Sequence, residues 1–402
     1  MTDDLAEPFR FEYVPATVRY GPNCVSQLAS EVTALGSERA LVVTGSTVGE
    51  TTAVMDPVRA GLDDRLAGVF AGTTPEKRLG TAYEALSAYR DADADAIVAV
   101  GGGSSLDVAT VLSVLVGTDR EPEAVGAELV ERGTLSVPEA GVPPVLTVPT
   151  TLAGADLSQV AGVTADPATC PVEDAASGAV GDPELMPAAA CYDPVLVATT
   201  PRGVLAGSAM NGFDKGIETL YARNRTPVTD ATATRGLGLL ADGLDALGEG
   251  ETDEATFQRL TRGILLVQYG ISRPDGTTLS LIHAFGHGLT RTYDVQQGAA
   301  HAVVAPHALS YLFEAVDGRR DLLAEALGVE GAEDPAAAVV DRVAAVAAGL
   351  GLPTRLRDVD GPTRSELPDV ADAVLADAFM ANAPPELDPT RGDIVGVLEA
   401  AW

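Results

Sequence analysis

Short apolar runs alternate with helical patterns between residues 38 and 150, and this alternation constrains the fold more than any other feature of the sequence. The apolar runs occupy residues 40–44, 68–70, 96–100 and 144–148, and the helical patterns occupy residues 54–62, 81–89 and 104–116. Strands that alternate with helices are joined by right-handed crossovers and pair in a parallel sheet. We therefore predict an α/β nucleotide-binding domain with a parallel sheet.

After Pro201 the pattern changes to long amphipathic helices rich in alanine and leucine. These helices are predicted at residues 228–247, 257–269 and 336–350. A Pro- and Gly-rich passage at 166–188, which predicts loops or a hairpin, precedes the change. We place one boundary, between an α/β dinucleotide-binding domain over residues 1–197 and an all-helical catalytic domain over residues 198–402. The acidic segment 118–141 is expected to be a solvent-exposed insertion.

Acidic residues greatly outnumber basic ones: 58 Asp and Glu stand against 26 Lys and Arg, a net charge of −32, and only Lys77 and Lys215 are lysines. Such a surface stays hydrated where concentrated salt shortens the Debye length to ~3 Å. We therefore predict a halophilic, cytoplasmic protein, the alternative being an acidic face that binds a partner. No basic stripe is present for nucleic acid, and no apolar run approaches the roughly 18 residues of a membrane span.

A glycine-rich turn follows the apolar run 96–100 and opens a helix. Its residues are Gly101, Gly102, Gly103, Ser104 and Ser105. Glycines let the backbone approach a ligand, and the free N–H groups at a helix N-terminus bind phosphate. Ser104 and Asp107 have the spacing of a capping box. The turn predicts a pyrophosphate site, although the glycines could instead make only a tight turn, because the spacing is not GxGxxG.

Two hydroxyl residues, Thr150 and Thr151, follow the apolar run 144–148. The carboxyl edge of a parallel sheet is where ligands bind in open α/β folds. We predict that both threonines contact the ligand, although two threonines after a strand often form only a turn.

All four histidines of the chain fall within 25 residues, at His283, His287, His301 and His307. His283 and His287 are four residues apart, so on a helix they share one face, as in a metal pair or a proton relay. The clustering predicts a functional site. The alternative is that one or two of them are hydrogen-bonded core residues.

Lys215 lies in the segment 211–218, which is predicted to open a helix after the domain boundary. A lysine kept in a chain that avoids lysine favours a specific role, such as stabilising an oxyanion. The alternative is a solvated helix residue that pairs with Asp214 or Glu218.

These motifs, in this order, resemble those of the iron-containing (group III) alcohol dehydrogenases over nearly the whole chain. Residues 101–104 and 149–151 resemble the cofactor loops of that family. Three stretches are more similar still to its maleylacetate reductase branch: residues 211–218 with 220–222, 301–309 and 397–402. The resemblance implies a dehydroquinate synthase-like architecture, an α/β domain followed by an all-α domain, and an oxidoreductase that uses NADP or NAD.

The resemblance also places the family's four metal ligands. The matching positions here are Asn211, Lys215, His283 and Gln297. Two amides, an ammonium and one imidazole would not hold a divalent ion. We therefore predict no metal, with Lys215 supplying the positive charge beside the substrate oxygen. Either His283 or His287 is expected to return a proton, and His287, which matches a histidine that lines the same cleft in the family, is expected to be the proton relay.

The cofactor region departs from the family in two ways. Thr110 stands where the family commonly has a lysine, and no Lys or Arg occurs between Asp166 and Pro201. Gly45 stands where NAD-preferring members carry an aspartate, so the resemblance leans slightly toward NADP. The predicted cofactor-binding residues are Gly45, Gly101, Gly102, Gly103, Ser104, Ser105, Thr150 and Thr151.

The sequence thus predicts an NAD(P)H-dependent oxidoreductase that transfers hydride to or from a small carbonyl, alcohol or activated enoate, and a homodimer by resemblance. Three alternatives stay open. One is a metal-dependent alcohol dehydrogenase with rearranged ligands, such as His283, His287 and His301. Another is a relative of dehydroquinate synthase or glycerol-1-phosphate dehydrogenase, against which the chain shows little basic clustering for a phosphorylated substrate. The third is a non-catalytic binding or oligomeric subunit.

Overall fold

The structure is a computed structural model that describes residues 9–14, 16–118 and 120–402. Contacts group the described chain into two compact units. The α/β unit holds residues 16–209 and 250–265, and the helical unit holds residues 9–14, 210–249 and 266–402. We predicted a single boundary after residue 197; beyond the short N-terminal segment, the grouping changes unit between Ala209 and Met210, inside helix α8 (Arg202–Tyr221). The boundary itself stays a prediction.

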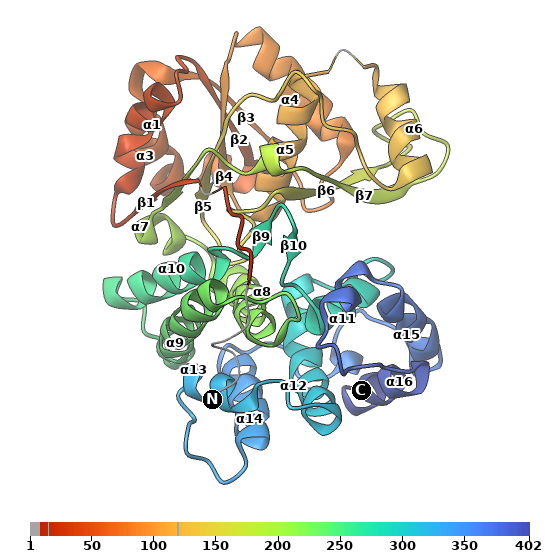
Figure 1. The fold of residues 1–402 in the computed structure, drawn as a ribbon. Helices are drawn as coiled ribbons and strands as arrows, with labels where there is room; N and C mark the ends of the chain where they lie inside the picture. Colours follow the sequence, from red (N-terminus) through yellow and green to blue (C-terminus); the bar gives the residue numbers. More distant parts are fainter. Residues whose placement is uncertain (1–8, 15, 119) are drawn as a thin grey trace. The chain divides into compact units, whose positions relative to one another are not determined.

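The α/β unit is built on a six-stranded sheet in the order β1-β8-β5-β4-β2-β3 (Figure 1). In that order the strands are Thr17–Tyr20, Ala189–Tyr192, Val145–Pro149, Ala96–Gly101, Ala40–Gly45 and Leu66–Thr73. Every neighbouring pair is parallel, which confirms the predicted parallel sheet. Strands β1 and β8 were not predicted, because each has only four residues and shows too little periodicity to identify.

Helices cover both faces of the sheet, and its central strands β2 and β4 are therefore buried on both sides. The helices are α1 (Leu28–Ala34), α3 (Thr52–Leu62), α4 (Leu79–Asp91) and α5 (Gly103–Val116). Leu41 and Ile97 pack with α4 and α5, whereas Val42 and Val98, one residue further along each strand, pack with α1 and α3. Successive side chains of each strand thus face opposite layers of helices. Helix α5 follows directly after the carboxyl end of β4.

The described part of the segment 118–141 is largely exposed, as we predicted, but it is not a separate insertion, because one face of it is buried. It forms helix α6 (Pro122–Arg132), whose Val125 and Leu129 are buried in the same core as α4 and α5. These two residues are four apart, so they share one face of the helix. The acidic composition concealed that spacing. The passage 166–188 contains part of an antiparallel hairpin, β6 (Val160–Ala165) and β7 (Ala176–Gly181), as one of the two predicted forms.

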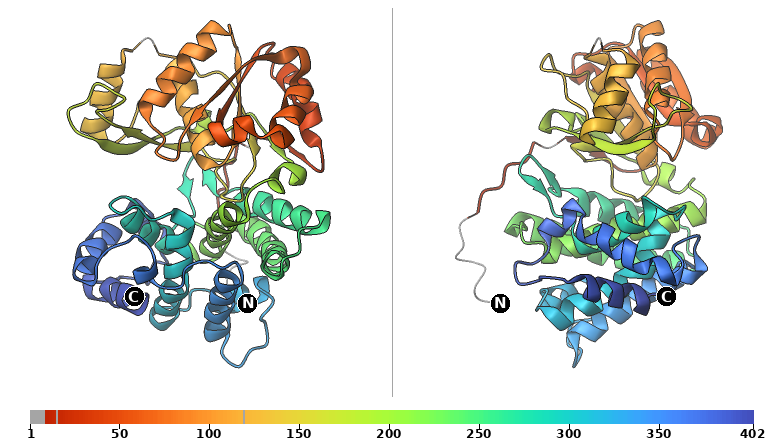
Figure 2. Two further views of the ribbon diagram at one scale, coloured as in Figure 1. Left: turned by 180° about the vertical axis from the view of Figure 1, so that it is seen from behind. Right: turned by 90° about the vertical axis from the view of Figure 1, so that its right-hand side faces the viewer.

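The helical unit consists of helices packed on one another (Figure 2, residues 227–249 in green and residues 281–400 in teal to dark blue). It also has one hairpin of two-residue strands, β9 (Ser272–Arg273) and β10 (Gly276–Thr277). Its helices are α9 (Pro227–Glu249), α11 (Leu281–Thr290), α12 (Gln297–Ala315), α13 (Arg320–Ala326), α14 (Pro335–Gly349), α15 (Leu367–Leu375) and α16 (Arg391–Ala400). Helix α11 packs against α12 and α15, and α12 also contacts α14 and α16. This confirms the all-helical character predicted for the second part of the chain.

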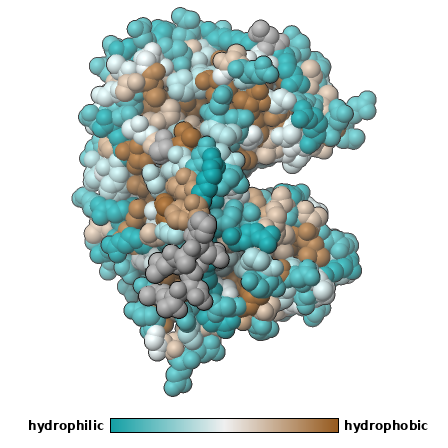
Figure 3. Space-filling view, in the orientation of Figure 1, coloured by the Kyte–Doolittle hydropathy of each residue, from teal (hydrophilic) through white to brown (hydrophobic). Residues whose placement is uncertain are grey.

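The described helices include none that is both long enough and apolar enough to span a bilayer. On the face drawn in Figure 3 hydrophilic residues predominate, and the hydrophobic residues form small separate patches.

Candidate active site

The predicted cofactor residues converge at the carboxyl edge of the sheet, where β2, β3 and β4 end. A Cβ atom placed on Gly101 would lie 3.0 Å from the Ser105 hydroxyl oxygen, and one on Gly45 would lie 3.2 Å from the Thr73 carbonyl oxygen. The hydroxyls of Ser105 and Thr73 are themselves 2.6 Å apart. Gly101 has a φ of +139°, which side chains rarely allow. Glycine is therefore required at 101, and Ser105 fixes the turn rather than facing solvent.

Helix α5 begins at Gly103, and its N-cap is the extended Gly102 without a side-chain cap. The capping box that we predicted from Ser104 and Asp107 is therefore wrong, because Ser104 lies inside the helix instead of before it. Gly102, Gly103 and Ser104 are partly exposed. The first turn of α5 thus carries no capping side chain. The Ser105 N–H donates to the Gly102 carbonyl over 3.0 Å, and the N–H groups of Gly103 and Ser104 are the ones available to a ligand.

One buried polar atom at this edge of the sheet also points to a ligand. The hydroxyl of Thr44, at the carboxyl end of β2, is fully buried and makes no hydrogen bond among the described residues. It would lie 3.9 Å from a Cβ on Gly101. Nearby, Thr151 approaches Gly102, and the Thr150 N–H donates to the Gly101 carbonyl over 3.0 Å. Residues 44, 101–105 and 150–151 therefore lie next to one another and form one candidate cofactor site.

A second cluster lies in the helical unit, on one face of α8. Asn211, Asp214, Lys215 and Glu218 are three or four residues apart and are all buried, with Lys215 only 9% exposed. We predicted that the segment 211–218 opens a helix. That prediction is wrong, because α8 begins earlier, at Arg202. The solvated role for Lys215 is also wrong, because this face of α8 packs into the unit.

His283, on α11, is held by two residues of α8. Its backbone N–H donates to Glu218 Oε1 over 2.9 Å, and its Nδ1 is hydrogen-bonded to Glu218 Oε2 at 2.5 Å. Its Nε2 lies 3.0 Å from Asn211 Oδ1. Because both ring nitrogens are engaged, the orientation of the ring is fixed, and its Nε2 faces α8.

His301, on α12, is fully buried beside this pair. Its ring packs edge-to-face on His283, with centroids 4.5 Å apart. Its Nδ1 is 3.2 Å from Asp214 Oδ2, yet neither side chain makes a hydrogen bond of good geometry among the described residues. Buried polar groups usually have partners.

Burial determines the protonation of this cluster. Burial, together with the charge of Glu218, raises the pKa of Asp214 well above its ordinary value, and burial raises the pKa of Glu218 to about 7. Burial lowers the pKa of His301 to about 3 and that of His283 well below its ordinary value, and the ammonium of Lys215 lowers both further. Near neutral pH the two imidazoles are therefore uncharged, and burial favours the protonated form of Asp214.

His287, the third predicted catalytic residue, belongs to a carboxylate–imidazole pair that sequence reasoning missed. Its Nδ1 lies 2.9 Å from Asp377 Oδ2, and Arg291 contacts the same carboxylate at 2.9 Å. Although burial acts to raise it, hydrogen bonds from His287 and the Phe379 N–H hold the pKa of Asp377 below its ordinary value. Asp377 stays ionised and orients the imidazole of His287. No local signal links positions 90 residues apart.

The donor set for a metal does not fit a divalent ion. His283 contributes one imidazole, and the neighbouring Asn211, whose Oδ1 lies 3.0 Å from Nε2, contributes only a neutral amide. Lys215 carries an ammonium, and Gln297, at the start of α12, carries another neutral amide. Among the described residues, no group of three or more His, Cys, Asp or Glu side chains is placed to hold a metal ion. That also removes the support for a rearranged site made of His283, His287 and His301.

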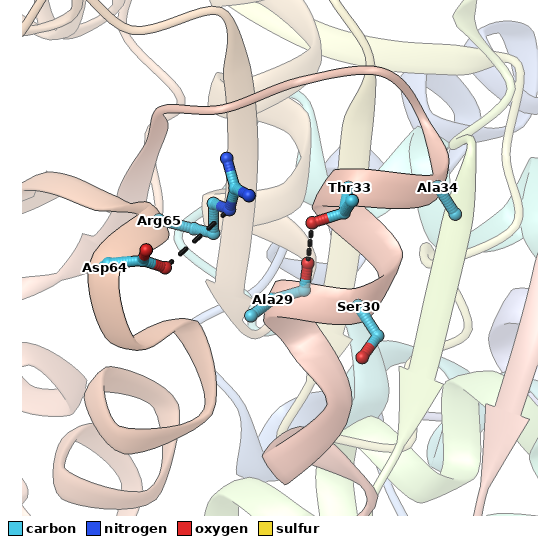
Figure 4. Close-up of a pocket in the computed structure, with 6 residues that line it drawn as sticks. All are labelled: Ala29, Ser30, Thr33, Ala34, Asp64 and Arg65. Atoms are coloured by element: carbon cyan, nitrogen blue, oxygen red, sulfur yellow. Dashed lines mark hydrogen bonds and ion pairs between the residues drawn. The ribbon is translucent and has the colours of Figure 1, made fainter.

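His307 is separate from the other three histidines. It lines a small hollow between α12 and α14 with apolar residues such as Val303 and Val340. Another surface hollow lies between α1 and the turn at 63–65, lined by Ala29, Ser30, Thr33, Ala34, Asp64 and Arg65 (Figure 4). It contains none of the predicted site residues and presents only short side chains and one arginine.

Comparisons with known proteins agree with the resemblance. The sequence pattern described as iron-containing alcohol dehydrogenase matches residues 15–194, and the pattern of that family's C-terminal part matches residues 205–402. Maleylacetate reductase 1 of Cupriavidus pinatubonensis is 29% identical over 385 residues, covering 94% of both chains. Lactaldehyde reductase of Escherichia coli is 27% identical over 396 residues, covering 96% of this chain and 98% of its own.

The solved structures agree as well. The crystal structure of maleylacetate reductase from Agrobacterium tumefaciens has a TM-score of 0.79 with this chain, at 23% identity and with 98% of both chains covered. At this identity the likeness shows the fold alone, and it confirms the predicted α/β and all-helical architecture. Together with the two sequence patterns, it shows that the chain belongs to the iron-containing alcohol dehydrogenase family and is an NAD(P)H-dependent oxidoreductase of the alcohol dehydrogenase/reductase kind.

Proposed function

We propose that the protein is a metal-free reductase that transfers hydride from NADPH or NADH to an activated carbonyl or enoate, as maleylacetate reductases do. One observation supports this most: Lys215, which the resemblance matches to a metal ligand of the family, is buried beside two imidazoles that are uncharged near neutral pH. A lysine ammonium here would provide the positive charge that the reaction needs, with no metal.

The residues at the sheet edge fit a dinucleotide. The first turn of α5 would hold the phosphates, and the buried hydroxyl of Thr44, with Thr150 and Thr151, would contact the rest of the molecule. Gly45 has no carboxylate to repel a 2′-phosphate, so NADP is accepted along with NAD. When bound, the nicotinamide supplies the hydride.

Side chains of the helical unit would stabilise the developing negative charge and transfer the proton. Lys215 donates hydrogen bonds to the oxygen on which negative charge develops. His283, fixed by Glu218, orients the substrate or donates a proton from Nε2. His287, held by Asp377, returns a proton from the solvent side, because its side chain is 25% exposed whereas that of His283 is 2% exposed.

The remaining expectations extend this proposal. The charge of −32 supports a salt-adapted, cytoplasmic protein that acts on small molecules and does not bind nucleic acid. We further propose a homodimer, as the resemblance to the family implies.

The proposal is tested by mixing the protein with maleylacetate and NADPH or NADH in concentrated salt and following nicotinamide absorbance. We expect oxidation of the cofactor with one equivalent of substrate reduced. Binding of cofactor without turnover of this or other short keto acids would argue for a different substrate class. Failure to bind either cofactor would favour a non-catalytic family member.

Replacing His287 by alanine is expected to lower kcat about 10²-fold, because a positioned general acid contributes that much or more. Asp377→Asn should lower kcat about tenfold, since it removes the charge that orients the imidazole. His307→Ala is the matched control and should leave kcat unchanged. Steady-state rates decide this, and wild-type turnover in His287→Ala would remove His287 from the mechanism.

A further inference from the structure

Lys77, the other lysine of the chain, lies in the loop between β3 and α4 in an unusual conformation. Its φ is +51°, a left-handed value that is uncommon for a residue other than glycine. Its N–H donates to the Thr74 carbonyl over 3.1 Å, and its own carbonyl accepts the Thr164 N–H over 3.0 Å. The loop is therefore fixed against strand β6, and the direction of the Lys77 side chain is set by the backbone.

That direction brings the ammonium to helix α5. Lys77 Nζ lies 2.5 Å from Asp107 Oδ2, whose side chain is only 11% exposed, and the same oxygen accepts the Gly162 N–H over 3.3 Å. A Cβ on Gly162 would lie 3.5 Å from both charged atoms, so glycine leaves room for the pair. The charge of Asp107 raises the pKa of Lys77, which keeps the ammonium protonated.

The pair lies close to the end of α5 that would bind phosphates. Asp107 is four residues beyond Gly103, which corresponds to about 6 Å along the helix. A lone carboxylate at that distance would repel a phosphate group. Because the pair is partly buried, salt in solution screens it less than a surface pair.

Few other cations are available to this part of the chain. The sequence has no lysine or arginine in residues 91–119 or 133–201, which include β4, α5, β5 and the β6–β7 hairpin. Thr110, where the family commonly has a lysine, turns its hydroxyl to the Leu106 carbonyl over 3.1 Å. Lys77 thus brings a positive charge to α5 from a different part of the sequence.

We propose that Lys77 is a cofactor-binding residue: its ammonium cancels the charge of Asp107, so that the N-terminal end of α5 accepts the diphosphate of an anionic dinucleotide. This inference rests on the proposed function. It explains how the chain could bind such a ligand without a lysine at Thr110, and it gives the left-handed backbone at Lys77 a purpose.

The test is a fluorescence titration with NADPH of the full chain in concentrated salt, using four variants. We expect Lys77→Met to raise the Kd about tenfold. The double variant Lys77→Met with Asp107→Asn should return to within about threefold of wild type, because no unpaired carboxylate remains. Lys77→Arg keeps the charge and should bind as wild type. Arg78→Met is the matched control, because Arg78 is the next residue along the chain and its guanidinium pairs with Asp166, at 3.4 Å, instead of with Asp107.

Either of two results would overturn the inference: Lys77→Met binds within twofold of wild type, or the double variant binds as weakly as Lys77→Met. If Lys77→Met does not fold, Lys77→Gln takes its place with the same expected tenfold rise in Kd, because glutamine also removes the charge but can still donate a hydrogen bond to Asp107. Absence of NADPH and NADH binding by the wild type would instead contradict the proposed function, and the inference would fall with it.

Discussion

Lys215→Met is expected to lower kcat about 10³-fold while NADPH binds within about threefold of wild type. Removing one donor that stabilises a developing oxyanion costs 10²–10³-fold in rate, and here the donor also carries the positive charge of the site. Methionine has nearly the same length and fills the same buried space, so the fold should persist. Cofactor binding should not change, because the predicted cofactor residues lie in the other unit of the chain.

Lys215→Arg serves as the control for charge. It keeps the positive charge but needs more room, so we expect partial activity, above that of the methionine variant. The rates are measured under saturating cofactor, with thermal unfolding monitored in parallel. Turnover of Lys215→Met within tenfold of wild type would remove Lys215 from the mechanism.

Gly286→Ala is expected to destabilise the helical unit by about 1–3 kcal/mol, as overpacking of a core does, and to lower turnover about 10²-fold. A Cβ at this position of α11 would lie 2.3 Å from Nε2 and 2.6 Å from Cδ2 of His301. The His301 ring is fully buried against His283 and Asp214, so it cannot move aside without displacing them. The loss of activity follows because the orientation of His283 changes.

Gly396→Ala is the matched control for this variant. Gly396 lies in helix α16, is exposed, and has no atom within 4 Å of an added Cβ. Alanine should stabilise that helix by up to about 1 kcal/mol. Chemical unfolding measures both variants, and a Gly286→Ala protein as stable and active as wild type would show that the packing of His301 is looser than described.

The sheet was largely predictable, because local patterns determine it. The runs at 40–44 and 96–100 became β2 and β4 with nearly the predicted bounds, since alternating strands and helices leave few arrangements. Strand β8 was missed because four residues give no periodicity. The buried face of α6 was missed because net acidity outweighed two apolar residues, Val125 and Leu129.

The site was predictable only where its residues lie close in sequence. The turn at 101–105 and Lys215 were found from their own motifs. The pairs that give these residues their chemistry join distant segments: Glu218 with His283, 65 residues apart, and His287 with Asp377, 90 residues apart. Such pairs depend on how α8 and α11 pack, which no local pattern specifies. The contact of Lys77 with Asp107 was not predicted either, because these residues also lie on separate segments of the chain.

The most direct test of the central claim is the metal content of the purified protein, measured together with its NADPH-dependent turnover before and after treatment with a chelator. We predict far less than one metal ion per chain and turnover unchanged by the chelator, because Asn211, Lys215 and Gln297 leave His283 without partner ligands. One metal ion per chain, with activity lost on its removal and restored by adding it back, would contradict the account.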